Sequence, residues 1–231
     1  MKLSYLLAGF ATLALPLSFA QAVNYAGNGN SGFGGVISSL DIVDDGTNIT
    51  FTLNRGPGDL NDAFVLYISA ASGGFNTTEN FTDSDDPLRR AISGFDGANR
   101  STVNLPFNAG FGLGLEPGFS GLWSLVEGGT HNFVAIANAA PGGNSQPSYA
   151  MTVSLANLGL NPGDSFQFVG TYLNPENAFR SNEGIGDGLP SDNPGQSDVT
   201  FTGSRLYTTI PEPTSALLAG FGLLALLRRR R

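Results

Sequence analysis

Residues 36–53 read VISSLDIVDDGTNITFTL, and this stretch decides the fold class. Its second half alternates, with Ile49, Phe51 and Leu53 on one side of an extended chain and threonines on the other. The Asp-Asp-Gly at 44–46 is typical of a tight turn, because these residues adopt turn conformations at little cost. The stretch therefore predicts a β-hairpin whose two strands flank that turn.

The same pattern of short apolar or alternating runs continues on the C-terminal side of this hairpin. Further strands are expected at residues 63–69, 110–115, 122–126, 131–137, 150–155, 165–172 and 198–202. No helical periodicity of useful length interrupts them. A series of nine or ten short strands predicts an all-β domain, a β-sandwich or jelly roll. Residues 78–96 and 174–198 are polar and are expected to be long loops, which often carry binding function.

The composition excludes several classes of site. There is no cysteine, which removes disulfides, thiolate nucleophiles, zinc–thiolate sites and iron–sulfur clusters. Between the two ends of the chain, six arginines face 18 carboxylates. Such an acidic, lysine-free surface repels nucleic acid, whose binding requires clustered lysine and arginine. We therefore expect no nucleic-acid partner.

The N-terminus has the organisation of a secretory signal peptide. Lys2 provides a positive charge, and residues 3–17 form an almost unbroken apolar run. Ala20 and Ala22 are small residues at the two positions that signal peptidase inspects. Residues 1–22 are therefore predicted to be removed by signal peptidase, which leaves an exported domain of residues 23–209.

The C-terminal segment, residues 210–231, has three parts. Pro211, Glu212 and Pro213 form an extended motif, since proline cannot continue a helix or donate its amide. Residues 215–227 are almost entirely apolar and predict a helix of about 20 Å, short for a hydrocarbon core of about 30 Å. A basic cluster closes the chain: Arg228, Arg229, Arg230 and Arg231. By the positive-inside rule these arginines stay cytoplasmic and the domain lies outside the inner membrane.

This tail resembles the PEP-CTERM sorting signal, in which a Pro-Glu-Pro motif precedes a short transmembrane helix and a basic end. The resemblance covers residues 210–231, and it departs from the usual pattern at Ile210 and at Thr214-Ser215. It implies recognition by an exosortase, a membrane protease-transpeptidase of bacteria that make extracellular polysaccharide. It further implies that the protein is anchored in the membrane before processing and then resides in the cell envelope or extracellular matrix.

The middle of the chain is similar to jelly-roll domains of carbohydrate-binding type. The residues that carry this similarity are 62–69 followed by Gly73-Gly74, and 158–164 leading into 165–172. The similarity implies a jelly-roll fold. It includes no diagnostic catalytic motif, and fold alone does not carry function.

Two kinds of candidate site stand out among the polar residues. His131, the only histidine, follows a Gly-Gly-Thr turn without a G-x-S-x-G elbow and is expected to be a turn residue rather than a general base. Asp83, Asp85 and Asp86 are candidate ligands for a structural calcium ion, although the spacing of an EF-hand loop is absent. The alternative is a solvated acidic loop. The G-x-G-x-x-G match at 27–32 lacks a preceding strand and is interpreted as chance.

Aromatic residues leave the question of sugar binding open. Tyr67, Trp123, Tyr149 and Tyr172 lie in apolar strands, where core packing is expected more often than stacking on sugars. We therefore predict a non-enzymatic envelope or matrix component, structural or associated with polysaccharide and without a catalytic cofactor. The alternatives are a carbohydrate-binding module and a glycoside hydrolase, whose pair of carboxylates sequence spacing cannot reveal.

Overall fold

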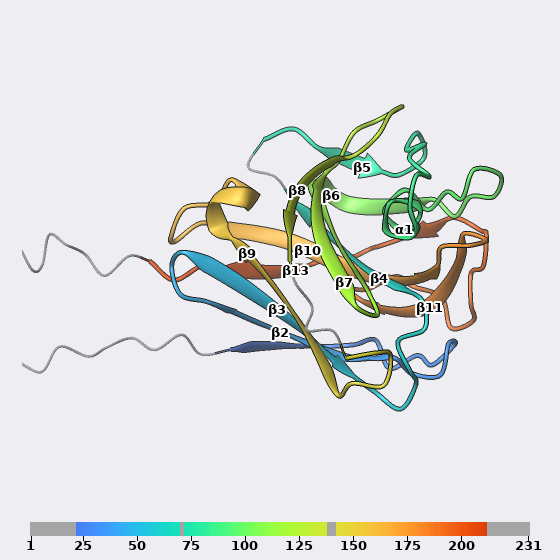
Figure 1. The fold of residues 1–231 in the computed structure, drawn as a ribbon, viewed down its shortest axis with the longest axis horizontal. Coiled ribbons are helices and arrows are strands. Elements are labelled where there is room, and N and C mark those ends of the chain that lie inside the picture. The colour runs from blue at the N-terminus through green and yellow to red at the C-terminus, as the bar shows by residue number, and fades with distance from the viewer. Residues whose placement is uncertain (1–21, 70–71, 138–141, 212–231) are drawn as a thin grey trace, which may run out of the picture.

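A computed structural model describes residues 22–69, 72–137 and 142–211, which form a two-sheet sandwich (Figure 1). The described residues contain thirteen strands, one short α-helix and one 3-10 helix. The all-β architecture predicted from the sequence is confirmed. The strands are β1 (Val23–Ala26), β2 (Ile37–Asp44), β3 (Asn48–Arg55), β4 (Ala63–Ser69), β5 (Phe75–Thr77), β6 (Val103–Glu116), β7 (Phe119–Ser124), β8 (Asn132–Ile136), β9 (Ser148–Ser154), β10 (Ser165–Asn174), β11 (Phe179–Ile185), β12 (Val199–Thr200) and β13 (Arg205–Thr208).

The smaller sheet contains four antiparallel strands in the order β1-β2-β3-β9. The predicted hairpin is present, with Ile42 of β2 opposite Phe51 of β3. Its turn is held by aspartates, because Asp45 Oδ1 accepts the backbone N–H groups of Thr47 and Asn48 at 2.9 and 2.7 Å. The sequence pattern therefore predicted both the strands and the turn that sets their register.

The larger sheet contains nine strands, six of them in the order β11-β10-β4-β6-β7-β8. Strands β5 and β12 pair with β6, and β13 pairs with β10. The parallel pairing of β12 with β6 is the exception in an otherwise antiparallel sheet. This sheet is buried on both faces along β4, whose residues from Ala63 to Ile68 are all buried.

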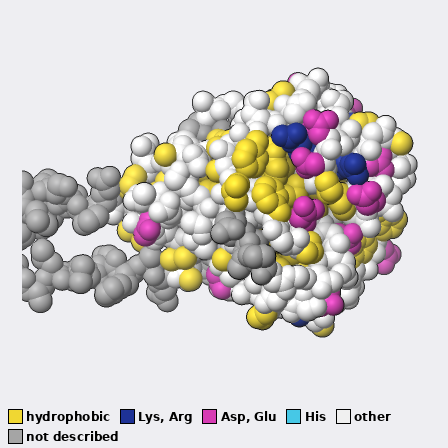
Figure 2. Space-filling view, viewed as in Figure 1, with side chains coloured by type: hydrophobic (Ala, Val, Ile, Leu, Met, Phe, Trp, Pro, Cys, Tyr) yellow, Lys and Arg dark blue, Asp and Glu magenta, His cyan; other side chains and the backbone are white. Residues whose placement is uncertain are grey.

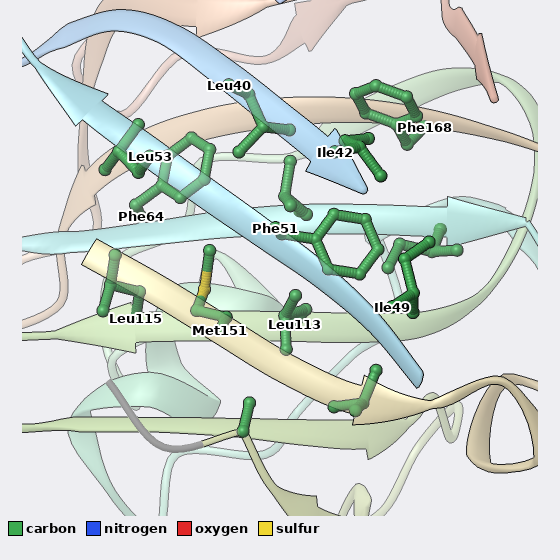
Figure 3. Packing of buried hydrophobic residues seen from close by; sticks show 14 of the residues in the cluster. Leu40, Ile42, Ile49, Phe51, Leu53, Phe64, Leu113, Leu115, Met151 and Phe168 are labelled. Carbon is green, nitrogen blue, oxygen red and sulfur yellow. The ribbon is translucent and has the colours of Figure 1, made fainter. Parts of the chain in front are cut away.

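The main core lies between the two sheets (Figure 3). From the smaller sheet it takes the alternating apolar residues of β3, each fully buried. From the larger sheet it takes Phe64, Leu113 and Phe168, which face them. Burial of this apolar surface is the principal stabilising contribution to the fold.

A second core covers the outer face of the larger sheet. Helix α1 (Pro87–Ser93) packs there through Leu88, Ala91 and Ile92. Asp86 caps the helix by accepting the Arg89 N–H at 2.9 Å, and Gly94 ends it in a left-handed conformation with φ 59°. The prediction of a long loop at residues 78–96 is therefore wrong in part, because these residues include helix α1. At seven residues this helix is too short to show a periodic pattern in the sequence.

The long loop predicted at 174–198 is also wrong in part, because it contains β11. This strand reads FRSNEGI and is buried despite its polar composition. Arg180 donates hydrogen bonds to Ser101 Oγ, the Ser101 carbonyl and Thr171 Oγ1. A polar strand can be buried when its polar groups find such partners, which here lie on other segments of the chain.

One edge of the larger sheet carries exposed apolar side chains. Phe133 and Ile136 of β8 are 47% and 62% exposed. Figure 2 shows hydrophobic side chains gathered over the part of the surface where β6, β7 and β8 lie, next to acidic and basic ones.

Both predicted membrane-directed segments fall largely outside the described residues. The signal peptide is represented only by Ala22, and the helix predicted at 215–227 is not described. Within the described ranges, no helix is long and apolar enough to cross a membrane.

Candidate functional site

The chain leaves the domain at a point that we call the sorting junction, made by Asp44, Tyr207, Thr209 and Ile210. Asp44 is 2% exposed, and its carboxylate accepts the Tyr207 hydroxyl at 2.7 Å and the Ile210 N–H at 3.1 Å. Burial, followed by the Asp44 carboxylate, raises the pKa of Tyr207 above its ordinary value. The tyrosine therefore stays protonated and continues to donate.

Thr209 adds a second set of bonds at the sorting junction. Its N–H donates to the Asp164 carbonyl at 2.9 Å, and its hydroxyl donates to the Asn161 carbonyl at 3.0 Å. The same hydroxyl accepts the Gly163 N–H at 2.8 Å. The backbone is thus held to the residue before Pro211, and Pro211 itself is exposed. No flexible linker separates the folded domain from the Pro-Glu-Pro motif.

The other end of the exported domain lies beside this junction. Val23 pairs with Ile42, two residues before Asp44. Tyr25 donates its hydroxyl to the Leu206 carbonyl at 2.6 Å, which joins β1 to β13. In Figure 1 the start of β1 and the end of β13 accordingly lie at the same end of the sandwich. Both predicted processing points therefore belong to one end of the domain.

The predicted processing residues are only partly visible. Ala22 and Pro211 are described and exposed. The remaining ones lie outside the described residues: Ala20, Glu212, Pro213, Arg228, Arg229, Arg230 and Arg231. Their roles stay predictions.

His131 is buried just before β8 and has the wrong hydrogen-bond pattern for a base acting on a neighbouring serine. Its Nδ1 accepts the Val126 N–H at 3.1 Å, so in the neutral ring Nε2 carries the proton. Nε2 therefore donates to Ser93 Oγ, 3.1 Å away, and cannot remove the serine proton. Burial lowers the pKa of His131 to about 4.

The three candidate calcium ligands are engaged with protein groups. Asp83 is buried, and its Oδ2 accepts the His131 backbone N–H at 2.7 Å. Arg89 lies within ion-pair distance of all three carboxylates, at 3.6 Å from Asp83, 3.5 Å from Asp85 and 3.4 Å from Asp86. Among the described residues, no group of three or more acidic, histidine or cysteine residues is arranged to hold a metal ion. Calcium binding stays a prediction without support from this arrangement.

The aromatic residues considered for sugar stacking are all buried. Tyr67 and Tyr172 are fully inaccessible, and Trp123 and Tyr149 are 2% exposed. Tyr67 donates its hydroxyl to the Ile92 carbonyl at 2.7 Å, which ties β4 to helix α1. The core interpretation of these residues is confirmed.

A polar groove runs from Arg205, the first residue of β13, toward the end of the sandwich away from the sorting junction. Part of its lining falls in residues 174–198, which were expected to form a binding loop, but the groove itself was not predicted. We call it the distal groove. It consists of two adjoining hollows of about 380 Å³ each, which share Asn30 and Ser191. Its lining comes from the loop after β1, from β11, from the loop that follows β11 and from the first residue of β13: Asn28, Gly29, Asn30, Ser31, Gly32, Asn182, Gly186, Asp187, Gly188, Leu189, Ser191, Asp192, Asn193 and Arg205.

The walls of the distal groove are held by amide hydrogen bonds. The Asn182 carbonyl accepts from Asn28 Nδ2 at 2.7 Å and from Asn30 Nδ2 at 2.9 Å. Asn182 Oδ1 accepts the Gly32 N–H at 2.9 Å, and Asn193 Oδ1 accepts the Asn182 N–H at 3.0 Å. The two lining segments are each dense in Asn, Ser, Asp and Gly, which is the one sequence signal that could have identified them.

Beneath the groove, Glu183 fixes the loop after β1. This fully buried carboxylate accepts four backbone N–H groups, from Phe33, Gly35, Val36 and Ile37, at 2.6 to 3.2 Å. The glycine-rich stretch at 27–32 leads into this set of donors. The conformation of this stretch therefore places the backbone N–H groups that follow it around the Glu183 carboxylate.

Comparison with known proteins identifies one segment. Residues 209–231 match the model of the PEP-CTERM protein-sorting motif. No curated protein and no solved structure matches the chain. The match begins at Thr209, inside the sorting junction, and agrees with the resemblance seen in the sequence.

Proposed function

We propose, from the premise that residues 209–231 form a PEP-CTERM sorting motif, that this protein is a non-enzymatic component of the cell envelope or extracellular matrix. The motif marks an exported protein that is anchored at the membrane before processing and is processed by an exosortase. The finer part of the proposal is that the β-sandwich then serves as a structural or polysaccharide-associated module.

The observation that carries this proposal is the sorting junction. The motif starts where the last strand ends, and Asp44 holds Ile210 against the hairpin turn. Because Val23 lies beside the same turn, both ends of the domain are at one side, and a domain anchored there exposes the rest of its surface. Such an arrangement suits display of a folded module outside the cell.

The non-enzymatic part of the proposal draws support from the environment of His131. A histidine acting as general base needs an unprotonated ring nitrogen directed at the group it serves, and here that nitrogen accepts a backbone N–H. The proposal predicts no turnover of neutral or acidic polysaccharides by the processed protein, as measured by release of reducing ends. Detectable turnover that purifies with the protein would overturn it.

Processing is tested by changing the motif. The intact mass and location of the protein are measured in its own host for the wild type, for Glu212→Ala and for a matched control, Glu176→Ala. Glu176 is an exposed glutamate whose contact is a surface ion pair with Arg90. We expect the wild type and the control to lack the terminal apolar segment, and Glu212→Ala to retain it and stay in the membrane.

Two results would contradict this expectation. If the wild type keeps residues 215–231, the segment is a permanent anchor and the sorting proposal fails. If Glu212→Ala is processed like the wild type, the glutamate is not read by the processing enzyme.

A further inference from the structure

We propose that the distal groove binds an uncharged polysaccharide. The inference rests on the proposed matrix function and deepens it, because it assigns the contact with polysaccharide to a defined surface. A sugar site at the buried aromatic residues of the strands is excluded, because their side chains are inaccessible to solvent.

The position of the groove is the first argument. The sorting junction contains the turn between β2 and β3, whereas most of the groove is built from the loop after β1, from β11 and from the loop that follows β11. Only Arg205, at the start of β13, lies near the junction. In Figure 1 that turn lies at one end of the sandwich, and β11 lies at the other. A domain attached through its sorting junction therefore presents the hollow lined by Ser31, Asp192 and Asn193 away from the membrane, toward extracellular polymer.

The groups available in the groove are the second argument. Within the described part of the chain, the side chains of Ser31, Ser191 and Asp192 have no hydrogen-bond partner, although all three line the groove. Two hydroxyls and a carboxylate supply both donors and acceptors, which matches the hydroxyl groups of a sugar. The nearby Asp187 is satisfied by Arg205, with N–O distances of 2.8 and 2.9 Å.

An aromatic pair beside the groove is the third argument. Phe33 follows Gly32 of the groove directly, and its ring stacks on that of Phe179 with an interplanar angle of 14° and centroids 6.1 Å apart. Phe179 is 37% exposed, although Gly195 also packs against its ring. The exposed part of a rigid aromatic ring next to hydrogen-bonding groups can pack against the apolar face of a sugar ring.

Rigidity of the groove is the fourth argument. Glu183 and Asn182 hold both lining segments through hydrogen bonds, so the groove exists before a ligand arrives. A preformed site loses little conformational entropy on binding. Gly32 permits this close packing, because a Cβ at that position would overlap the Asn193 side chain.

Charge indicates which polysaccharides fit. Asp192 is unpaired, and the exported domain carries 18 carboxylates against six arginines. Repulsion should exclude polyanionic chains such as polyuronates, particularly at low ionic strength. The ligand class is therefore an uncharged polysaccharide.

The test uses the processed protein recovered from its own host. Its mobility is measured in gels that contain neutral polysaccharide, either dextran or the neutral fraction of the host's extracellular polymer, or that contain alginate. We expect neutral polymer to retard the wild type and alginate not to do so. The double variant Ser191→Ala/Asp192→Ala and the single variant Phe179→Ala should each bind at least about tenfold more weakly.

Two matched controls come from the same chain. Ser197→Ala/Asp198→Ala changes an exposed Ser-Asp pair six residues further along the same loop, outside the groove. Phe133→Ala removes an exposed phenylalanine on β8. Both controls should bind like the wild type, and circular dichroism should show all variants folded.

The outcomes separate the site from the proposed function. Retardation of the wild type that neither groove variant reduces would overturn the groove as the site and leave polysaccharide association intact. Absence of retardation by any neutral polymer, together with retention of the protein in the matrix, would overturn polysaccharide binding but not sorting. Binding to alginate alone would overturn the assignment of an uncharged ligand.

Discussion

Two buried carboxylates, Asp44 and Glu183, each gather hydrogen-bond donors from segments that are distant in the chain. Asp44 lies at the hairpin turn and accepts from Tyr207 and Ile210. Glu183 accepts from backbone positions 146 to 150 residues away. Buried charges are tolerated when hydrogen bonds replace their hydration, so both residues act as fixed points of the fold.

These two roles could not be predicted from the sequence. A polar residue carries no mark of its partners when those partners lie more than a hundred positions away. The burial of Trp123 and Tyr67 was predictable, because an aromatic residue within an apolar strand has little alternative to the core. At the scale of residues, apolar burial follows from local pattern, whereas polar burial depends on tertiary pairing.

The buried His131 predicts a specific dependence of stability on pH. Its pKa is about 4 in the folded protein and about 6.5 when unfolded, so only the unfolded chain takes up a proton between these values. Stability is therefore lost as pH falls through this window. We expect the free energy of unfolding, measured with urea, to decrease by about 2 kcal/mol more between pH ~7 and pH ~4.5 in the wild type than in His131→Gln.

The carboxylates of the domain contribute equally in both proteins and cancel in this difference. Glutamine retains an N–H donor that can reach Ser93, so the variant is expected to fold. Identical pH profiles for the two proteins would mean that folding does not lower the pKa of His131.

At the scale of elements, strands with one polar face were predictable and two other kinds of element were not. Strands β3 and β9 alternate in burial, and their sequences alternate in the same way. Strand β11 is buried without being apolar, and α1 is too short to show a period. The distal groove was predicted only in part: its wall at residues 182–193 lies in the segment expected to carry binding function, but neither β11 nor the contact of this segment with the loop after β1 was predicted.

Helix α1 sits where β6 has glycine instead of a side chain. A Cβ at Gly112 would lie 3.0 to 3.2 Å from three side-chain atoms of Ile92, and one at Gly114 would lie 3.2 Å from Leu88. The helix can therefore approach the sheet closely enough to build the second core. Residue size along β6 sets the distance between these layers.

Replacing Gly112 by valine should displace the helix. The added atoms overlap Ile92, and overpacking of this kind typically destabilises a protein by about 1 to 3 kcal/mol. We expect a lower denaturation midpoint for Gly112→Val and faster hydrogen exchange in α1, both measured on the processed protein.

Gly129→Val is the matched control, since a Cβ there would meet only Val126 at an ordinary 3.6 Å. Equal destabilisation by both substitutions would show that a general effect of replacing glycine by valine, and not helix packing, accounts for the loss of stability.

At the scale of the whole molecule, the two ends of the sandwich differ in what they carry. The sorting junction occupies one end, and the distal groove extends from the start of β13 toward the other end. The sequence predicted that a β-sandwich is attached to the membrane through its C-terminal tail before processing. It did not predict which loops gather at the far end, because that depends on strand order across both sheets.

The orientation of the domain can be measured with single cysteines, which the natural chain lacks. Thr47→Cys places a label beside the sorting junction, and Ser191→Cys places one in the distal groove. With the full-length protein reconstituted in liposomes, a quencher attached to lipid headgroups should quench the label at position 47 more strongly than that at 191.

Soluble iodide serves as the control for this experiment and should quench both labels to a similar degree, because both positions are exposed. Stronger headgroup quenching at position 191 would mean that the domain lies with its groove against the membrane, which would also remove the geometric basis of the polysaccharide proposal.

The bonds from Asp44 to Ile210 bear on how many copies of this protein would organise on a common support. A module joined through a long flexible tail swivels freely and presents its surfaces at random angles. Here the backbone is immobilised up to Ile210, and Pro211 restricts the next rotation. Copies joined through this end should share a tilt relative to their support and form an oriented layer, so that their outer faces would engage one polymer strand in register.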